Sequence, residues 1–389
     1  MKQVYLDTNA TTAPYPEVIE EMLSFFKGTY GNASSIHAFG RNAKKGLKIA
    51  RERVAAFIGA DSPDEIVFTS GGTESDNFAL NQVLSAAGNK DKHIITTCVE
   101  HQAVLNTCRY LEQTGVRVTY LNVDGYGQIS LEELKKRITK NTVLISVMAA
   151  NNETGVLMPI EEIGIIAKEN NILFHTDAVQ MIGKLPFDVK KCGADLVSMS
   201  AHKINGPKGA GALFVKQGTR ITPYFYGGHQ EKGLRAGTEN VPGIVGFGKA
   251  CEVTRSRFNG DFEKIKTLKG LLYEGIKRNI RDIRLNGDPE KCLPNTLNIS
   301  FAYVEGEAIV LKLDAEGIAV STGSACTSGS ADPSYVLKNM KVDSLFIQGA
   351  IRFSLGVFNS REEIGYVIKK LPPIIEKLRK MSPICPANK

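Results

Sequence analysis

Two residues, Lys203 and Asp177, have the types and surroundings that carbonyl chemistry requires. Residues 195–200 read as a buried strand, and Lys203 stands just beyond it. A lysine alone is more often a solvated surface residue. At a strand end, however, its amine can form a Schiff base with a carbonyl cofactor once loss of water lowers its pKa. Asp177 ends the apolar run 172–176, where a carboxylate could keep a pyridine nitrogen protonated. The pair predicts a site for pyridoxal phosphate (PLP).

Residues 69–77 could hold the phosphate of such a cofactor. The segment follows a strand-like run, opens a helical pattern and is rich in small and hydroxyl residues. Backbone amides at Gly72 and Thr73 could therefore approach an anion at the positive end of a helix. Ser200 and His202 could add further donors to the phosphate. The alternative is a plain glycine-rich helix N-cap.

His101 and Asn152 follow two other strand-like runs. His101 could stack on a planar ring or move protons, or it could simply cap a helix. Asn152 could bond a ring hydroxyl, or it could belong to an ordinary turn. Ligands of open α/β sheets lie beyond the carboxyl ends of the strands. We therefore expect both residues to meet Gly72, Asp177 and Lys203 at one edge of a sheet.

The elements that must position these residues alternate along the chain. Strand-like runs occupy residues 66–69, 93–97, 117–121, 143–148, 172–175, 196–199 and 212–215. Helical patterns between them occupy residues 74–84, 102–112, 131–138 and 160–169. This alternation predicts an α/β fold with a mostly parallel, seven-stranded sheet covered by helices. Runs that are apolar throughout fit burial on both faces.

The pattern changes after about residue 241. A long helical stretch covers residues 243–278 and leads to strand candidates and helices that suit a smaller α+β domain. The strand candidates are residues 295–301 and 351–355, and the helices are residues 306–315 and 361–380, the last interrupted at Pro372 and Pro373. We expect a large domain over residues 16–255. The small domain should combine residues 1–15 with residues 256–389.

Composition bounds the class of protein. The 389 residues are 42% hydrophobic and 23% charged, as in ordinary globular proteins. No apolar run approaches the ~20 residues that span a bilayer, and the N-terminus lacks the features of a signal peptide, so we expect a cytoplasmic protein. The net charge of +7 is dispersed, which favours an acidic protein partner over direct nucleic-acid binding. Seven cysteines without a C-x-x-C pair predict reduced thiols rather than disulfides or structural zinc.

One of the seven cysteines, Cys326, has unusual neighbours in the sequence. Residues 321–333 are almost all small, which predicts a mobile loop with a single thiol. A free thiol has a pKa near ~8.5 and is intrinsically nucleophilic in the small fraction that is ionised. Such a thiol suits a group that collects an atom in one place and delivers it in another.

These motifs together resemble those of the cysteine desulfurases, which are class V enzymes of PLP fold type I. The resemblance covers nearly the whole chain and includes the subgroup that supplies iron–sulfur cluster assembly. Its motifs are residues 5–12, 30–37, 151–155, 175–180, 200–203, 321–326 and 351–356.

The resemblance implies roles for the cofactor-binding residues. Lys203 would hold PLP as a Schiff base, His101 would stack on its ring, and Asp177 would pair with the ring nitrogen. The remaining contacts would come from Asn152 and Gln180 near the ring hydroxyl, from Gly72, Thr73, Ser200 and His202 at the phosphate, and from Thr238, which would reach the phosphate of the other subunit in a homodimer.

The resemblance also implies the reaction. Arg352, with Asn32 nearby, would clamp the carboxylate of L-cysteine. Cys326 would take the substrate sulfur as a persulfide while alanine leaves, then pass it to an iron–sulfur scaffold or another acceptor protein. Cys326 could also be a transient ligand of an iron–sulfur cluster.

Three alternatives stay open at this point. A selenocysteine lyase would share the same residues, whereas a class V aminotransferase would need no loop thiol, so Cys326 argues against it. A PLP-binding assembly partner without catalysis would not need the complete set of Lys203, Asp177, His101 and Cys326.

Overall fold

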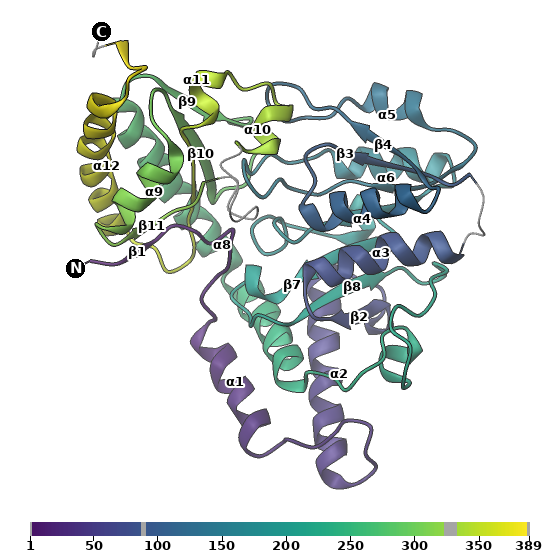
Figure 1. Cartoon of the computed structure of the whole chain (residues 1–389). Coiled ribbons are helices and arrows are strands. Elements are labelled where there is room, and N and C mark those ends of the chain that lie inside the picture. Colours follow the sequence, from purple (N-terminus) through teal and green to yellow (C-terminus); the bar gives the residue numbers. More distant parts are fainter. Residues whose placement is uncertain (1, 87–90, 323–332, 387–389) are drawn as a thin grey trace.

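A seven-stranded sheet forms the centre of the larger part of the molecule (Figure 1). The computed structural model describes residues 2–86, 91–322 and 333–386. The strands lie in the order β2-β8-β7-β6-β5-β3-β4. They are β2 (Ile66–Thr69), β3 (His93–Thr97), β4 (Arg117–Leu121), β5 (Thr142–Ser146), β6 (Leu173–Asp177), β7 (Leu196–Ser200) and β8 (Gly211–Val215). The strands from β4 to β7 pair in parallel, and β8 is antiparallel to β7 and β2. The predicted fold class is confirmed.

Alternate residues of these strands enter two different cores. Ile145 and Phe174 pack in the core that includes α2 (Ala38–Ile58), α6 (Ile160–Glu169) and the first part of α8 (Val241–Asn279). Leu144 and Leu196 face the opposite core. That core includes α3 (Gly72–Ala86) and α4 (Gln102–Gln113). Burial on both faces explains why apolar residues occupy neighbouring positions of these strands rather than every second one.

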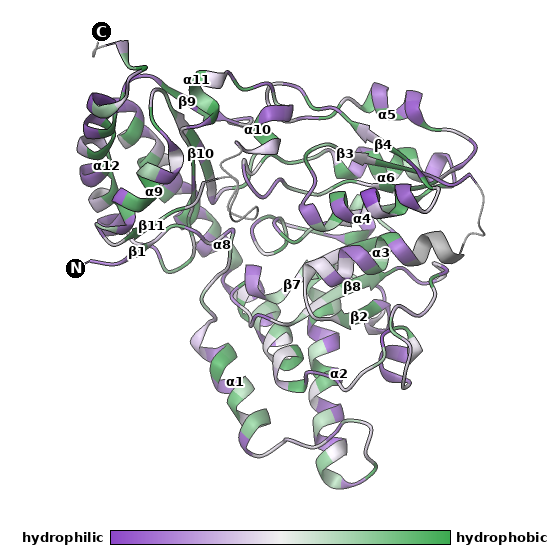
Figure 2. Cartoon of the chain, in the orientation of Figure 1, coloured by the Kyte–Doolittle hydropathy of each residue, from purple (hydrophilic) through white to green (hydrophobic). Residues whose placement is uncertain are grey.

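The remaining helices of this part are α1 (Pro16–Lys27), α5 (Leu131–Arg137) and α7 (Val189–Cys192). In Figure 1, α1 and α2 extend together below the sheet, where they pack against α8. The sequence patterns did not predict α1. Figure 2 shows apolar residues along it, and several of them are exposed.

A second, smaller sheet has the order β12-β10-β9 and is antiparallel. Its strands are β9 (Ile283–Asn286), β10 (Thr296–Phe301) and β12 (Ala350–Ser354), and nearby β1 (Val4–Tyr5) pairs in parallel with β11 (Ile318–Ala319). Helices α9 (Gly306–Asp314) and α12 (Arg361–Met381) pack in the core of this part, whereas α10 (Tyr335–Asn339) and α11 (Ser344–Ile347) pack against the core of the larger part. Helix α8 joins the two parts, since its Val253 lies in one core and its Leu268 in the other. The domain boundaries given above stay a prediction.

The predicted interruption of the last helix was wrong. Helix α12 runs through Pro372 and Pro373 without a break. A proline inside a helix removes a hydrogen bond and crowds the preceding turn, which normally kinks or ends the helix. Here Leu371 and Ile375, on either side of the pair, are buried in the core of the smaller part. Packing against α8 and α9 therefore outweighs the local cost.

Within the described ranges, no helix is long and apolar enough to cross a membrane. The same residues contain no group of three or more histidine, cysteine or acidic side chains that could hold a metal ion.

Candidate active site

Three strand ends bring Asp177, His101 and Lys203 into one electrostatic cluster. Asp177 is the last residue of β6, His101 follows the loop after β3, and Lys203 ends a single 3-10 turn that directly follows β7. Burial raises the pKa of the Asp177 carboxyl, and the neighbouring His101 and Lys203 oppose that rise. The same two partners act on His101, whose pKa is lowered mainly by burial. Three of the five residues expected at this sheet edge therefore interact with one another.

His101 is a neutral ring held by the helix that it begins. It is the N-cap of α4, and its Nδ1 accepts a hydrogen bond from the amide of Ala103 at 3.2 Å. An accepting Nδ1 carries no proton, so the proton of the neutral ring lies on Nε2. The side chain also lines a hollow of about 390 Å³ together with Thr73. The capping role and the site role are therefore compatible.

Lys203 is held by the N-terminal segment of the chain. Its Nζ donates to the carbonyl oxygen of Asn9 and, at 2.8 Å, to that of Ala10. Asn9 is almost fully buried between the two parts of the molecule. The segment after β1 thus forms one wall of the site.

The start of α3 and the end of β7 form a narrow cradle. A Cβ atom at Gly71 would lie 3.7 Å from the hydroxyl of Ser200, and one at Gly72 would come within 2.8 Å of Val179. The Ser200 hydroxyl is buried and has no hydrogen-bond partner within the described ranges. A buried hydroxyl of this kind beside the N-terminus of a 15-residue helix suits an anionic group. Gly72, Thr73 and Ser200 therefore fit the phosphate role.

His202 stands next to this cradle as an uncharged donor. Its Nδ1 is 3.1 Å from the hydroxyl of Thr11. Burial, with the nearby positive charge of Lys203, lowers the pKa of His202 to about 4. The ring can therefore offer a hydrogen bond to a phosphate without adding charge.

Asn152 and Gln180 are both tied to Asn9. Gln180 donates from Nε2 to the Asn9 carbonyl at 3.0 Å, and its Oε1 accepts from Lys184 at 2.7 Å. The backbone oxygen of Asn152 accepts from the side-chain Nδ2 of Asn9 at 3.2 Å. The side-chain oxygen of Asn152 is buried without a partner in the described part of the chain, so it is available to a ring hydroxyl.

Arg352 lies on β12 and is 3% exposed. Its Nη1 donates to the backbone oxygen of Asn152 at 2.9 Å, and its Nη2 donates to Asp7 at 2.8 Å. Because Asn152 also contacts Asn9, the guanidinium is linked through Asn9 to Lys203. A planar donor in this position suits a carboxylate.

Two predicted residues lie apart from this cluster in a single chain. Asn32 is exposed in the loop between α1 and α2, at the far end of these helices from the small sheet (Figure 1). Its side chain accepts from the Ser34 amide at 2.9 Å. Thr238 is exposed in another hollow, which Ser70 also lines. Cys326 lies outside the described residues.

The comparisons with known proteins agree with this geometry. The model of the family described as "Aminotransferase class-V" matches residues 4–367. A "Cysteine desulfurase IscS" from Dictyoglomus turgidum is 50% identical over 98% of this chain and 97% of its own length. One from Methanosarcina thermophila is 49% identical over 99% of this chain and 95% of its own. A solved NifS-like protein superposes with a TM-score of 0.91 at 42% identity, covering 97% of this chain and all of that one.

This chain belongs to the class-V aminotransferase family. Its relatives at about 50% identity are cysteine desulfurases, so it groups with that branch of the class-V family. The resemblance read from the motifs is confirmed, and so is PLP as the cofactor. The unpartnered Ser200 hydroxyl, the unpartnered Asn152 oxygen and the cradle at Gly72 all fit that cofactor.

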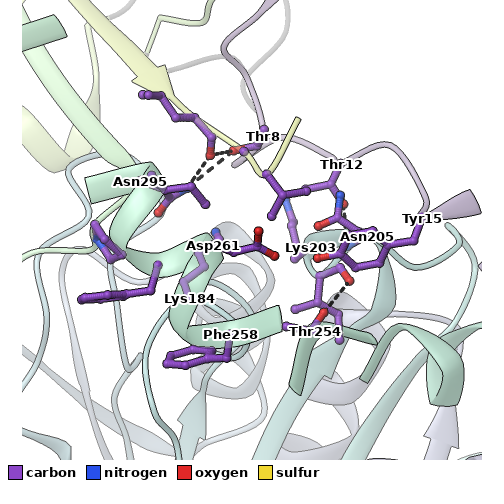
Figure 3. Close-up of a pocket in the computed structure, with 18 residues that line it drawn as sticks. Thr8, Thr12, Tyr15, Lys184, Lys203, Asn205, Thr254, Phe258, Asp261 and Asn295 are labelled. Carbon is purple, nitrogen blue, oxygen red and sulfur yellow. Dashed lines mark hydrogen bonds between the residues drawn. The ribbon is translucent and has the colours of Figure 1, made fainter. Parts of the chain in front are cut away.

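Sequence reasoning missed two residues of this class-V site, Asn9 and Lys184. Asn9 was noted only as part of the motif 5–12, because its side-chain and backbone contacts reach residues that are 143 to 345 positions away. Lys184 donates to both Asn9 and Gln180, and burial lowers its pKa well below the usual value. Figure 3 shows Lys184 and Lys203 on the wall of a small cavity of about 50 Å³, which Asp261 also lines. A lone lysine in a Gly-Lys-Leu-Pro segment gives no signal of this position.

Proposed function

We propose that this class-V enzyme is a cysteine desulfurase in which Lys203, Asp177, His101 and Cys326 are the catalytic residues. It would take sulfur from L-cysteine and release L-alanine. The observation that carries the proposal is the meeting of Asp177, His101 and Lys203 at one sheet edge, linked through Asn9 to a buried arginine.

The residues that would hold PLP surround the end of β7. Lys203 would bind it covalently, Asp177 would face the ring nitrogen, and the neutral His101 would lie against the ring. The phosphate contacts would come from Gly72, Thr73, Ser200 and His202, and the ring hydroxyl would meet Asn152 and Gln180. When bound, PLP supplies an electron sink for the pair of electrons left behind as a Cα proton departs.

The chain's own groups would position the substrate and move its proton. Arg352 would bind the carboxylate of L-cysteine through its planar donor edge. The Lys203 amine, once it is exchanged for the substrate amine, would take the Cα proton. The carbonyl oxygens of Asn9 and Ala10, which accept hydrogen bonds from Lys203, would keep that amine within the site.

Sulfur transfer would fall to Cys326. Its thiolate would attack the substrate sulfur, so that an S–S bond forms while the carbon–sulfur bond of the substrate breaks. The substrate carbon takes up a proton and leaves as alanine, and Cys326 keeps the sulfur as a persulfide. The step balances without an external oxidant.

We also propose that the enzyme works as a homodimer. Helix α1 exposes Leu23 at 44% and Phe26 at 62%, and Ile36 in the following loop is 91% exposed. Apolar side chains gathered in this way support burial against a second copy. In the dimer, Thr238 would reach the phosphate in the neighbouring subunit, and Asn32 would act near a substrate carboxylate.

The persulfide would then pass to an iron–sulfur scaffold or another acceptor protein in the cytoplasm. The six cysteines named outside the Cys326 segment are free thiols, which supports a reducing compartment. Cys326 could also serve as a transient ligand while a cluster is built.

Single-turnover sulfur transfer tests this proposal. The PLP-loaded enzyme, given L-cysteine without reductant, should release one alanine and gain one sulfur on the peptide that carries Cys326, as read by mass spectrometry. Cys326→Ser should bind cysteine and alter the cofactor absorbance but yield neither alanine nor transferred sulfur. Cys98→Ser removes a different thiol, far from Cys326 in the sequence. It is the control and should behave as the wild type. Added sulfur on another cysteine would overturn the assignment of Cys326.

A further inference from the structure

Arg352 carries a charge in a place that water hardly reaches. Every residue of β12 is buried, and the arginine side chain is only 3% exposed. A buried charge is strongly destabilising unless it is paired and hydrogen-bonded. Its charged partner is Asp7, whose Oδ1 lies 2.8 Å from Nη2. A neutral contact, the Asn152 backbone oxygen, accepts from Nη1.

This pairing is incomplete in one respect. The Nε donor of Arg352 is buried and has no partner within the described residues. Nε–H and one hydrogen of Nη2 point along the same edge of the guanidinium, where a carboxylate normally bonds to both at once. Asp7 uses one oxygen and reaches only Nη2. The other nearby carboxyl, Glu153, accepts instead from Ser334.

The two partners differ in their freedom to move. The Asp7 side chain is 20% exposed, against 3% for Arg352. Asp7 follows β1, and its backbone meets β12 through an isolated bridge to Ser354. An exchange of carboxylates on Arg352 would therefore displace Asp7 towards solvent and leave the arginine in place.

We infer that Asp7 occupies the Arg352 edge in place of the substrate carboxylate and leaves when a bidentate carboxylate arrives. Asp7 keeps the buried charge paired before substrate binds, and each carboxylate ligand must compete with it. It is thus a positioning residue that sets the affinity of the enzyme for carboxylate-bearing ligands. This inference rests on the proposed role of Arg352 as the carboxylate clamp.

The test uses Asp7→Asn in the PLP-loaded enzyme. Asparagine can still accept from Nη2, but it has no charge with which to compete. The KM for L-cysteine should fall by about tenfold while kcat stays within about twofold, which corresponds to ~1.4 kcal/mol of tighter binding. The inhibition constant of 3-mercaptopropionate, which has the carboxylate but no amine, should fall by the same factor. Cysteamine, which has the amine but no carboxylate, should bind as it does to the wild type.

Controls separate this inference from the assignment on which it depends. Asp314→Asn removes an exposed carboxylate on α9 that does not contact Arg352, and it should change neither ligand's affinity. Asp7→Ser should repeat the effect of Asp7→Asn, should the latter fold poorly. Unchanged or weaker carboxylate binding in both Asp7 variants overturns the inference. If Arg352→Ala leaves the KM for cysteine unchanged, the clamp itself is wrong and the proposed function needs a different substrate anchor.

Discussion

At the scale of single residues, Asp177 is a carboxylate kept in a place that disfavours charge. Burial raises its pKa, and the neighbouring His101 and Lys203 oppose that rise. Its Oδ1 accepts from the Val179 amide at 2.9 Å, which fixes the carboxylate at the end of β6. A buried carboxylate with such partners is well placed to hold a protonated ring nitrogen.

Removing that carboxylate should slow the reaction without removing the cofactor. In Asp177→Ala, Lys203 can still bind PLP, but the electron sink loses the charge that supports it. We expect the rate of alanine formation to fall by at least ~100-fold, or about 2.7 kcal/mol on the barrier. Steady-state kinetics with borohydride trapping of PLP would measure both properties. Near-normal turnover would show that Asp177 does not face the ring nitrogen.

Lys203→Ala should abolish covalent attachment and turnover together. No amine other than that of Lys203 is expected to bind the cofactor. Borohydride reduction followed by peptide mapping should find PLP on Lys203 in the wild type and on no lysine in the variant. Lys208→Ala, which removes an exposed lysine five positions away, is the matched control. Full sulfide release by Lys203→Ala would contradict the assignment.

At the level of single residues, the sequence predicted the members of the site that stand directly at strand ends. Lys203, Asp177 and His101 were identifiable because each follows an apolar run on the chain. Asn9 and Lys184 were not, because their roles arise from contacts with partners remote in sequence or on another element. Local patterns carry no information on such contacts.

At the scale of elements, the site residues lie at or after the strand ends, and the strands fix the positions of the loops that follow them. Strands β2, β3 and β4 begin and end at the residues that the strand-like runs predicted. Helix α1 was missed, and the break in α12 was wrong. Both depend on what packs against the helix rather than on its own residues.

Glu100 joins two of these loops and should make stability depend on pH. Its carboxyl is fully buried between β3 and β5, where Oε1 accepts from Thr97 at 2.8 Å and from the Met148 amide at 3.0 Å. Burial is the main cause that raises its pKa to about 8 from 4.5. Between these values the folded protein holds a proton that the unfolded chain has lost. The contribution of Glu100 to the free energy of unfolding is therefore full below about pH 4.5 and declines as pH rises to about 8.

Glu100→Gln removes this titration. We expect the urea midpoint of the wild type to fall, relative to that of the variant, as the pH rises from about 4.5 to about 8. Equilibrium unfolding at several pH values, with cofactor saturating, measures the difference. A constant gap between the two proteins would mean that Glu100 keeps the same protonation state in both folded and unfolded chains.

At the scale of the whole molecule, the proposed homodimer accounts for two groups of exposed residues. Thr238 and Asn32, the two predicted site residues that lie apart from the cluster, are both exposed. The apolar residues of α1 and the loop after it are exposed as well. A second copy that covers these residues accounts for both observations. No composition or periodicity of one chain could have revealed which residues of the partner complete a site.

Breaking the proposed dimer should therefore weaken the cofactor site from a distance. The double variant Leu23→Asp, Phe26→Asp places two charges on the exposed face of α1, where they would be costly to bury in an interface. We expect it to sediment as a monomer and to bind PLP at least ~10-fold more weakly, because Thr238 of the other subunit is lost. Leu311→Asp, at a side chain 70% exposed on α9, is the control and should stay dimeric with normal PLP affinity. Circular dichroism would verify that both variants fold. A monomeric wild type would contradict the dimer itself, and a monomeric double variant with unchanged PLP affinity would remove Thr238 from the cofactor site.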